Sequence, residues 1–311
     1  MKKITVVGAG NVGATCANVI AAKDLAREVV LLDVKDGLAE GKALDIWQTS
    51  PILHFNTRVT GSTNDYLKTK GSSVVVITSG LPRKPGMSRD DLIKTNALIV
   101  KEVTEKIVKY SPDAIIIVVS NPLDVMTYAA YKAANKSSNK VFGMAGILDT
   151  GRYKAFIADA LSVSPEDIHA MLLGGHGDTM VPLPRYTSIN GIPITELLGP
   201  DVIERIVERT RKGGGELVNL IGTSAWYAPG AAAAQMVEAI VDDQKRIFPV
   251  CAMLNGEYGL KDIYLGVPVK LGKEGIEEVI EISLDASEKK MLKASSDSVR
   301  AVMKVFDDLK I

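Results

Sequence analysis

A glycine-rich turn between an apolar strand pattern and a helical pattern constrains the fold of this chain more than any other feature. Residues 4–7 read Ile-Thr-Val-Val, and Gly8-Ala9-Gly10-Asn11-Val12-Gly13 follows at once. A G-x-G-x-x-G turn that ends a strand and opens a helix needs its first glycine for the tight turn and its third for close packing of helix on strand. The motif therefore predicts that the chain starts with a βαβ unit.

The first half of the chain repeats this alternation of strand and helix. Its strand patterns are apolar on both faces, which is typical of a parallel sheet covered on both sides by helices. We therefore predict an α/β fold with a doubly wound parallel Rossmann sheet. The expected strands are residues 4–7, 29–32, 74–78, 114–119 and 140–142, with helices at 11–23 and 88–110 among them.

The second half has a different pattern. Turn signals separate short apolar runs at residues 267–271 and 278–282, which suggest antiparallel strands. Helical patterns cover residues 201–221, 231–242 and 285–309, the last with a capping box of Asp285 and Glu288. Gly213-Gly214-Gly215 predicts a kink where a helix packs closely on another element. We expect a Rossmann domain over residues 1–144 and a mixed α+β domain over residues 145–311.

Composition excludes several classes of protein. The 311 residues are 46% hydrophobic and 24% charged, with 37 Lys plus Arg against 37 Asp plus Glu. The net charge of zero offers no basic surface for nucleic acid or an anionic membrane. Glycines interrupt the apolar stretch after Lys2 and Lys3, so we expect neither a signal peptide nor a membrane span. Cys16 and Cys251 lie far apart and suit a reducing cytoplasm.

Asp33 strengthens the interpretation of the glycine motif, which is weak alone. It ends the second apolar strand, 20 residues after Gly13. A carboxylate there can accept hydrogen bonds from an adenosine ribose and repels a 2′-phosphate, while the second glycine lets a pyrophosphate approach the backbone. The pattern favours NAD over NADP; the alternative is an aspartate that only caps a helix.

Only one of the three histidines has the setting of a catalytic base. Glycines flank His176 in Gly174-Gly175-His176-Gly177-Asp178, which leaves its imidazole open to a cleft. His54 and His169 are interpreted as structural or surface residues. Asp149 and Arg152 lie three positions apart and share one face of a helical turn, where a plain surface ion pair is the alternative.

Two further segments follow apolar strands. Residues 79–89 contain two prolines, two glycines and three cations, which suits a mobile lid over an anionic ligand or, alternatively, a solvated basic loop. Asn121-Pro122 follows the strand at 114–119, where the asparagine binds a ligand or merely caps the next helix. Open α/β sheets bind ligands at the carboxyl ends of their strands, where these segments are predicted to meet.

Together these motifs, in this order, resemble the lactate/malate dehydrogenase family over essentially the whole chain, and its lactate-dehydrogenase-like branch of malate dehydrogenases most of all. The resemblance implies reversible, NAD-dependent oxidation of (S)-malate to oxaloacetate without a metal. It assigns catalysis to His176 and Asp149, substrate binding to Arg83, Arg89, Asn121 and Arg152, and NAD binding to Gly8-Ala9-Gly10-Asn11-Val12-Gly13, Asp33, Asn96, Val119 and Asn121. Ser224 is a weaker candidate near the substrate.

Arg83 sets the expected substrate, a small dicarboxylate. In the family, pyruvate-reducing members typically have glutamine at the matching position and malate enzymes have arginine; a cation there pairs with the second carboxylate of oxaloacetate. The alternatives are a lactate or broader 2-hydroxyacid dehydrogenase, an NAD-dependent glycosidase, and an NAD-sensing module without turnover. The resemblance also implies a homotetramer, with a homodimer as the alternative.

Overall fold

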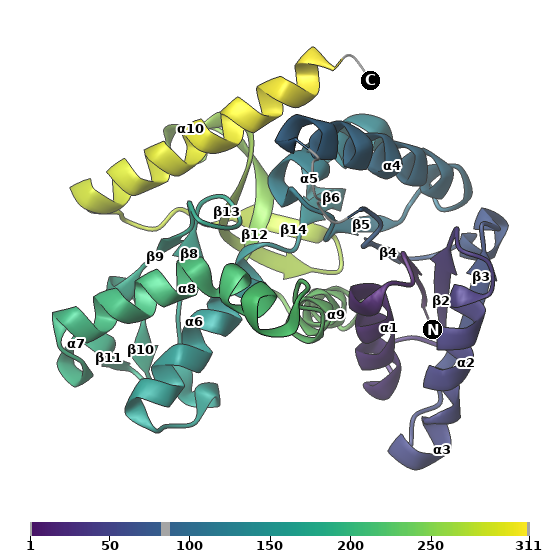
Figure 1. The fold of residues 1–311 in the computed structure, drawn as a ribbon, viewed down its shortest axis with the longest axis horizontal. Coiled ribbons are helices and arrows are strands. Elements are labelled where there is room, and N and C mark those ends of the chain that lie inside the picture. The colour runs from purple at the N-terminus through teal and green to yellow at the C-terminus, as the bar shows by residue number, and fades with distance from the viewer. Residues whose placement is uncertain (1, 82–87, 310–311) are drawn as a thin grey trace.

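The computed structural model describes residues 2–81 and 88–309, and its centre is one nine-stranded sheet of order β14-β13-β12-β6-β5-β4-β1-β2-β3. The six strands from β3 to β6 are parallel and form the predicted Rossmann sheet (Figure 1). Their bounds are β1 Lys3–Val7, β2 Glu28–Asp33, β3 Arg58–Thr63, β4 Val74–Ile77, β5 Ile115–Val118 and β6 Val141–Gly143.

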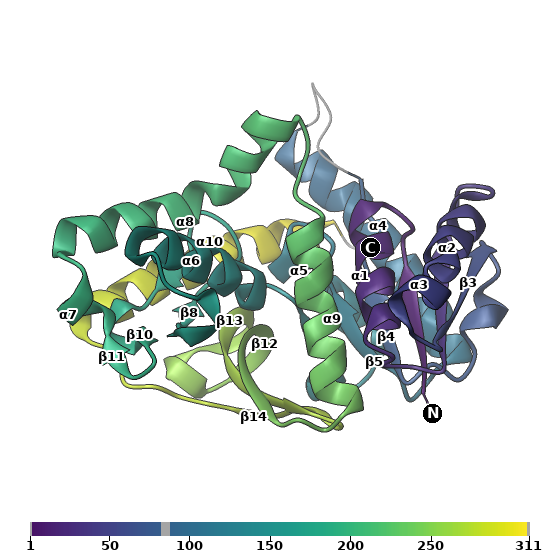
Figure 2. The ribbon, with the colours of Figure 1, turned by 90° about the horizontal axis from the view of Figure 1, so that it is seen from below.

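Helices cover both faces of this sheet. Crossover connections between parallel strands are right-handed. The helices that connect β1, β2 and β3 and those that connect β4, β5 and β6 therefore cover opposite faces of the sheet. Accordingly, α1 and α2 lie on one side and α4 and α5 on the other (Figures 1 and 2). The bounds are α1 Asn11–Ala22, α2 Leu38–Gln48, α3 Ser50–Leu53, α4 Arg89–Tyr110 and α5 Leu123–Ala134.

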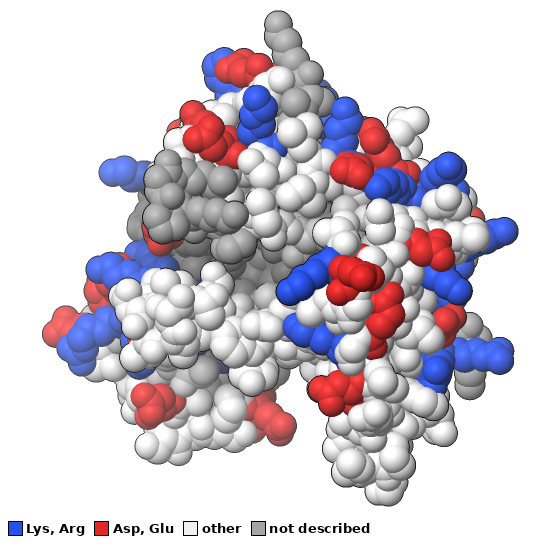
Figure 3. Space-filling view, turned by 45° about the vertical axis from the view of Figure 1, so that its right-hand side comes forward, with Lys and Arg blue, Asp and Glu red and all other residues white. Residues whose placement is uncertain are grey.

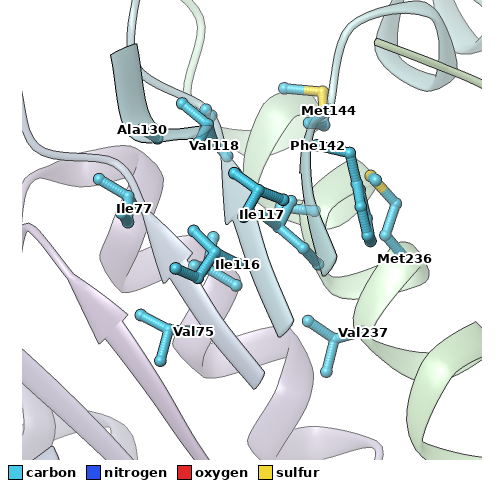
Figure 4. Packing of buried hydrophobic residues seen from close by; sticks show 14 of the residues in the cluster. Val75, Ile77, Ile116, Ile117, Val118, Ala130, Phe142, Met144, Met236 and Val237 are labelled. Atoms are coloured by element: carbon cyan, nitrogen blue, oxygen red, sulfur yellow. The ribbon is translucent and has the colours of Figure 1, made fainter. Parts of the chain in front are cut away.

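The buried strands pack as their composition predicts. β4 and β5 contribute Val75, Ile77 and residues 116–118 to a continuous apolar core. Met236 and Val237, from the helix α9 (Tyr227–Val241), lie beside Phe142 of β6 (Figure 4). These side chains are almost completely shielded from solvent. Helix α9 of the second half therefore packs against the core of the first half.

The antiparallel strands of the second half extend the parallel sheet, because Cys251 of β12 pairs with Gly143 of β6. β13 contains the predicted strand 267–271. The prediction of a strand at 278–282 was wrong in its bounds, since β14 ends at Val279. The strands are β12 Arg246–Asn255, β13 Lys261–Gly272 and β14 Gly275–Val279, with smaller sheets of β7 Ile168–His169, β10 Ser188–Ile189 and β11 Ile192–Pro193, and of β8 Leu172–Leu173 and β9 Val181–Pro182.

The remaining helices surround this part of the sheet. They are α6 Gly146–Leu161, α7 Ile194–Leu197, α8 Pro200–Ile221, α9 and α10 Ala286–Asp308. The predicted capping box of α10 is confirmed, since the backbone N–H of Glu288 donates to Asp285 and that of Asp285 donates to Glu288, both at 2.8 Å. α9 begins four residues before the expected 231, because Pro229 is compatible with a first helical turn. The division into two domains at residue 144 stays a prediction.

The face of the molecule in Figure 3 carries charges of both signs. Basic and acidic side chains lie close to one another there, with broad uncharged areas between the charged groups. None of the described helices is long and apolar enough to cross a membrane.

Candidate active site

The glycine turn joins β1 to α1 with the geometry that its three glycines permit. Gly8 has a φ of +103°, which L side chains rarely adopt. A Cβ on Gly13 would overlap the carbonyl oxygen of Gly8, whereas a Cβ on Gly10 would meet nothing within 4 Å. The first and third glycines are therefore required by the chain itself. The second borders open space at the N-terminus of α1, where unpaired N–H groups and the helix dipole favour a phosphate.

Asp33, the last residue of β2, contacts this turn. Its Oδ2 accepts a hydrogen bond from the N–H of Ala9 at 2.6 Å, and its Oδ1 accepts one from the N–H of Lys35 at 2.9 Å. Ala9 is buried and Val12 half-buried, but Asn11 is exposed and Asp33 remains partly accessible. The carboxylate thus has acceptor capacity left for hydroxyl groups beside the turn. These residues fit a dinucleotide.

Asn96 and Asn121 connect the next two segments. Asn96 of α4 is buried, and its amide donates to the carbonyl oxygens of Leu81 at 3.1 Å and Asn121 at 2.8 Å. Its Oδ1 accepts from the N–H of Leu81 at 2.8 Å. Asn121 itself is exposed, while Val119 is buried just after β5. Asn96 therefore holds two loops together, and its contact with a cofactor stays a prediction.

His176 and Asp149 form a hydrogen-bonded pair. Nδ1 of His176 lies 2.9 Å from Oδ2 of Asp149, a carboxylate that is 2% exposed. Because a carboxylate only accepts, Nδ1 carries the proton and Nε2 is left as the free acceptor of the neutral ring. Asp149 lies in the first turn of α6, and His176 reaches it from the loop after β8. His54 and His169 are exposed and lie outside this site.

The surroundings of His176 raise its pKa above the ordinary value. Burial lowers this pKa, but the neighbouring Asp149 carboxylate, its hydrogen bond and the charge of Asp124 outweigh burial; Arg152 opposes them. These neighbours therefore favour the imidazolium form more than water does. A histidine side chain is suited to act as a general base because it can both take and return a proton.

Arg152 lies on α6 one turn after Asp149 and contacts it. Its Nη1 lies 3.5 Å from Oδ1 of Asp149 and 3.4 Å from the carbonyl oxygen of Thr210. The arginine stem passes over Gly213 of α8, where a Cβ would overlap Cδ of Arg152. The predicted close packing of the glycine triplet is thus confirmed at Gly213. The partner of this glycine is a predicted substrate-binding residue.

Two predicted arginines lie wholly or partly outside the described residues. Arg83 lies outside the described residues, and so does the side chain of Arg89, whose backbone begins α4. Ser224 is exposed between α8 and α9. Within residues 2–81 and 88–309, no group of three or more His, Cys, Asp or Glu residues could hold a metal ion.

A cavity of about 490 Å³ opens beside His176. It lies between α5, the loop after β8 and α10. Sequence reasoning missed two polar residues here, Asp124 of α5 and Ser295 of α10, which contact the loop of His176. Asp124 has a local signal, because a carboxylate stands among Leu123, Val125 and Met126; Ser295 has none. The lining includes Asn121, Asp124, His176, Asp178, Thr179 and Val299.

Comparison with known proteins defines the class. The chain belongs to the lactate/malate dehydrogenase family: residues 2–143 match its NAD binding domain and residues 147–308 its alpha/beta C-terminal domain.

Proteins similar to this chain include malate dehydrogenases and lactate dehydrogenases. The chain is 66% identical over 307 residues to malate dehydrogenase from Cytophaga hutchinsonii, covering 99% of this chain and 98% of that protein. The solved malate dehydrogenase of Salinibacter ruber has a TM-score of 0.95 and 58% identity, covering 99% of this chain and 98% of that one. The lactate dehydrogenase of Cryptosporidium parvum, solved with lactic acid and nicotinamide adenine dinucleotide, has a TM-score of 0.94 and 39% identity, covering 98% of each chain.

Proposed function

We propose that this protein is an NAD-dependent malate dehydrogenase, which reversibly oxidises (S)-malate to oxaloacetate. The observation that carries the proposal is the His176–Asp149 hydrogen bond of 2.9 Å beside a cavity at the edge of a Rossmann sheet. An NAD-sensing module without turnover has no need of a buried carboxylate that holds an imidazole in one tautomer. The 66% identity to a malate dehydrogenase supports the choice of substrate.

In malate oxidation, His176 accepts the proton of the substrate hydroxyl at Nε2, because Nδ1 is engaged by Asp149. Asp149 fixes the ring and stabilises the imidazolium that forms. In oxaloacetate reduction the same imidazolium returns the proton to the carbonyl oxygen. Bound NAD supplies the acceptor for the hydride that leaves C2 of malate.

The arginines bind and orient the substrate. Arg152 is suited to bind the C1 carboxylate through two parallel hydrogen bonds, because its planar guanidinium matches a carboxylate. Arg89 polarises the carbonyl oxygen of oxaloacetate, and Arg83 pairs with the second carboxylate. Asn121 binds substrate beside the cofactor. These roles follow the family resemblance and residue chemistry.

The cofactor residues hold NAD at the glycine turn. Gly8-Ala9-Gly10-Asn11-Val12-Gly13 would receive the pyrophosphate, and Asp33 the adenosine ribose. Val119 and Asn121 follow β5, which β4 separates from β1 in the sheet, and Asn96 donates to the carbonyl oxygen of Asn121. Residues 1–144 would form the cofactor domain and 145–311 the substrate domain.

The protein also has apolar surface suited to self-association, and we propose a homo-oligomer, a tetramer in preference to a dimer. The α2–α3 patch consists of exposed Leu44, Trp47, Ile52 and Leu53; the α8–α9 patch consists of exposed Val218, Leu220, Ile221 and Tyr227. Clustered exposed apolar side chains mark interaction surfaces. Cys16 and Cys251 are buried and unpaired, which suits a reducing compartment such as the cytoplasm.

The deciding experiment measures initial rates of NADH oxidation with oxaloacetate and with pyruvate on purified protein. A preference for oxaloacetate by orders of magnitude is expected. A preference for pyruvate would instead identify a lactate dehydrogenase with the same fold and the same His176–Asp149 pair. Absence of turnover with both keto-acids would refute the proposed activity.

A further inference from the structure

A second buried carboxylate faces His176 from an element that the mechanism above does not use. Asp124 is the second residue of α5 and is 7% exposed. Its Oδ2 accepts a hydrogen bond from the backbone N–H of His176 at 3.1 Å. His176 therefore has one carboxylate at its ring and another at its main chain, from two different helices.

The main chain of the His176 loop is held by side chains. β8 ends at Leu173, and the N–H of Gly175 donates to Oγ of Ser295 at 2.8 Å, next to the bond between His176 and Asp124. Ser295 also donates to Oγ1 of Thr179 at 3.3 Å. Side chains of α5 and α10 thus bind two consecutive N–H groups of this loop.

The groups around Asp124 favour its charged form at neutral pH. The thiol of Cys251, on β12, donates to Oδ1 at 3.3 Å, and the N-terminus of α5 favours a negative charge. Burial raises the pKa of Asp124 to about 6, although the charge of His176 and these hydrogen bonds lower it. Because the Cys251 thiol is neutral, its hydrogen bond leaves the negative charge of the carboxylate in place.

Among the described residues, the charges that act on the His176 imidazole come from two helices, while Asp178 of the same loop lines the same cavity. α6 contributes Asp149 and Arg152, and α5 contributes Asp124. α10 packs on the same loop through Ser295 and Val299, which carry no charge. Asp124 is therefore a second negative charge beside the imidazole, and removing it leaves Asp149 opposed by Arg152.

We propose that Asp124 is a positioning residue for His176: it fixes the main chain of the histidine and favours the imidazolium. The proposal rests on the proposed function, because the imidazolium is the form that protonates oxaloacetate. Asp149 binds the imidazole ring itself, whereas Asp124 binds the backbone N–H of His176 and adds a second negative charge.

The test uses the scarcity of histidine. With three histidines in the chain, NMR of histidine-labelled protein resolves each imidazole, and His176→Asn identifies the signal of His176. Asp124→Asn keeps the shape and one acceptor but removes the charge; it is expected to lower the pKa of His176 by about one unit. Ser295→Ala is the matched control, since it removes the other loop contact without changing charge. It is expected to leave that pKa in place.

An unchanged pKa of His176 in Asp124→Asn would overturn the proposal, and so would an equal decrease in Ser295→Ala. Thermal unfolding of each variant reports whether it is folded. If Asp124→Asn does not fold, Asp124→Ser tests the same loss of charge with a smaller side chain. Turnover of oxaloacetate by the wild-type protein is measured separately. A wild-type protein without turnover would count against the proposed function, whereas an unchanged pKa of His176 in Asp124→Asn would count against the role of Asp124.

Discussion

Gly213 of α8 leaves the space that Arg152 of α6 occupies. A Cβ at position 213 would overlap Cδ of Arg152 and lie 2.7 Å from its Nε. Both residues border one cavity of about 670 Å³ between α1, α6, α8 and α9. The glycine therefore helps to set the position of the guanidinium that is proposed to bind the substrate carboxylate.

Gly213→Ala is expected to displace Arg152 and to raise KM for oxaloacetate about tenfold or more, because a misplaced guanidinium loses one of two parallel hydrogen bonds. Steady-state kinetics measure this effect. Gly214→Ala is the control: a Cβ there would meet nothing within 4 Å, and alanine in a helix interior is more stable than glycine by roughly 0.5–1 kcal/mol. Equal KM values in the two variants would contradict the positioning role of Gly213.

His176→Asn is expected to lower kcat by about 10²–10⁴-fold, since it removes the general base. NADH binding, measured by fluorescence titration, is expected to stay near the wild-type value because the glycine turn is untouched. Substantial remaining turnover would remove His176 from the mechanism.

The raised pKa of His176 predicts opposite pH profiles for the two directions. Oxaloacetate reduction needs the imidazolium, so its rate is present below this pKa and is lost as pH rises through it. Malate oxidation needs the neutral ring and gains rate over the same range. Because the pKa lies above its ordinary value, the rate of reduction is expected to fall at a higher pH than an unperturbed imidazole would give. Profiles of kcat/KM in both directions check this, and a common midpoint well below 6.5 would contradict the structure.

Asp33→Asn is expected to narrow the preference for NADH over NADPH. The amide no longer repels a 2′-phosphate, and it accepts fewer hydrogen bonds from the ribose. Binding constants for both cofactors provide the measurement, with the ratio decreasing by about tenfold for roughly 1.4 kcal/mol. Since Asp33 also accepts from Ala9, thermal unfolding is measured alongside. An unaltered ratio in a folded variant would exclude the ribose assignment.

Leu220→Glu is expected to weaken self-association, because it places a charge in the α8–α9 patch. Analytical ultracentrifugation of wild type and variant at one concentration measures the mass. Ile192→Glu, in exposed β11 outside both patches, is the matched control. If both variants keep the wild-type mass, Leu220 does not contribute to an interface; if both lose it, the effect is nonspecific.

The sequence predicts the parallel sheet well, because most of its strands are buried on both faces and read as short apolar runs. β3 was missed, since it is an edge strand in which Val59 and Ser62 are the buried residues and Gly61 packs on α2. The edge position allows polar side chains. The extension of the sheet through Cys251 and Gly143 was equally invisible, since 107 intervening residues leave no local pattern.

The candidate site also contains residues that a local motif predicts and residues that only the tertiary structure brings in. Asp149 and Arg152 were predictable because they share one helical face. The contacts of His176 with Asp124 and of Gly175 with Ser295 join positions 52 and 120 residues apart, which no motif records. The role of Asn96 as a tie between two loops also depends on tertiary structure. Local chemistry thus predicts the groups that are proposed to react but not the groups that hold them.

Arg83→Gln tests the choice of substrate most directly. Oxaloacetate carries a second carboxylate, and leaving a buried charge without its partner costs roughly 3–5 kcal/mol, which corresponds to a factor of about a hundred to several thousand. The variant is therefore expected to lose kcat/KM for oxaloacetate by about that factor and to retain or gain activity on pyruvate. Arg83→Lys keeps the charge without the planar guanidinium, so it is expected to fall between wild type and Arg83→Gln. Equal losses on both keto-acids would mean that Arg83 does not distinguish the two substrates and that another group pairs with the second carboxylate.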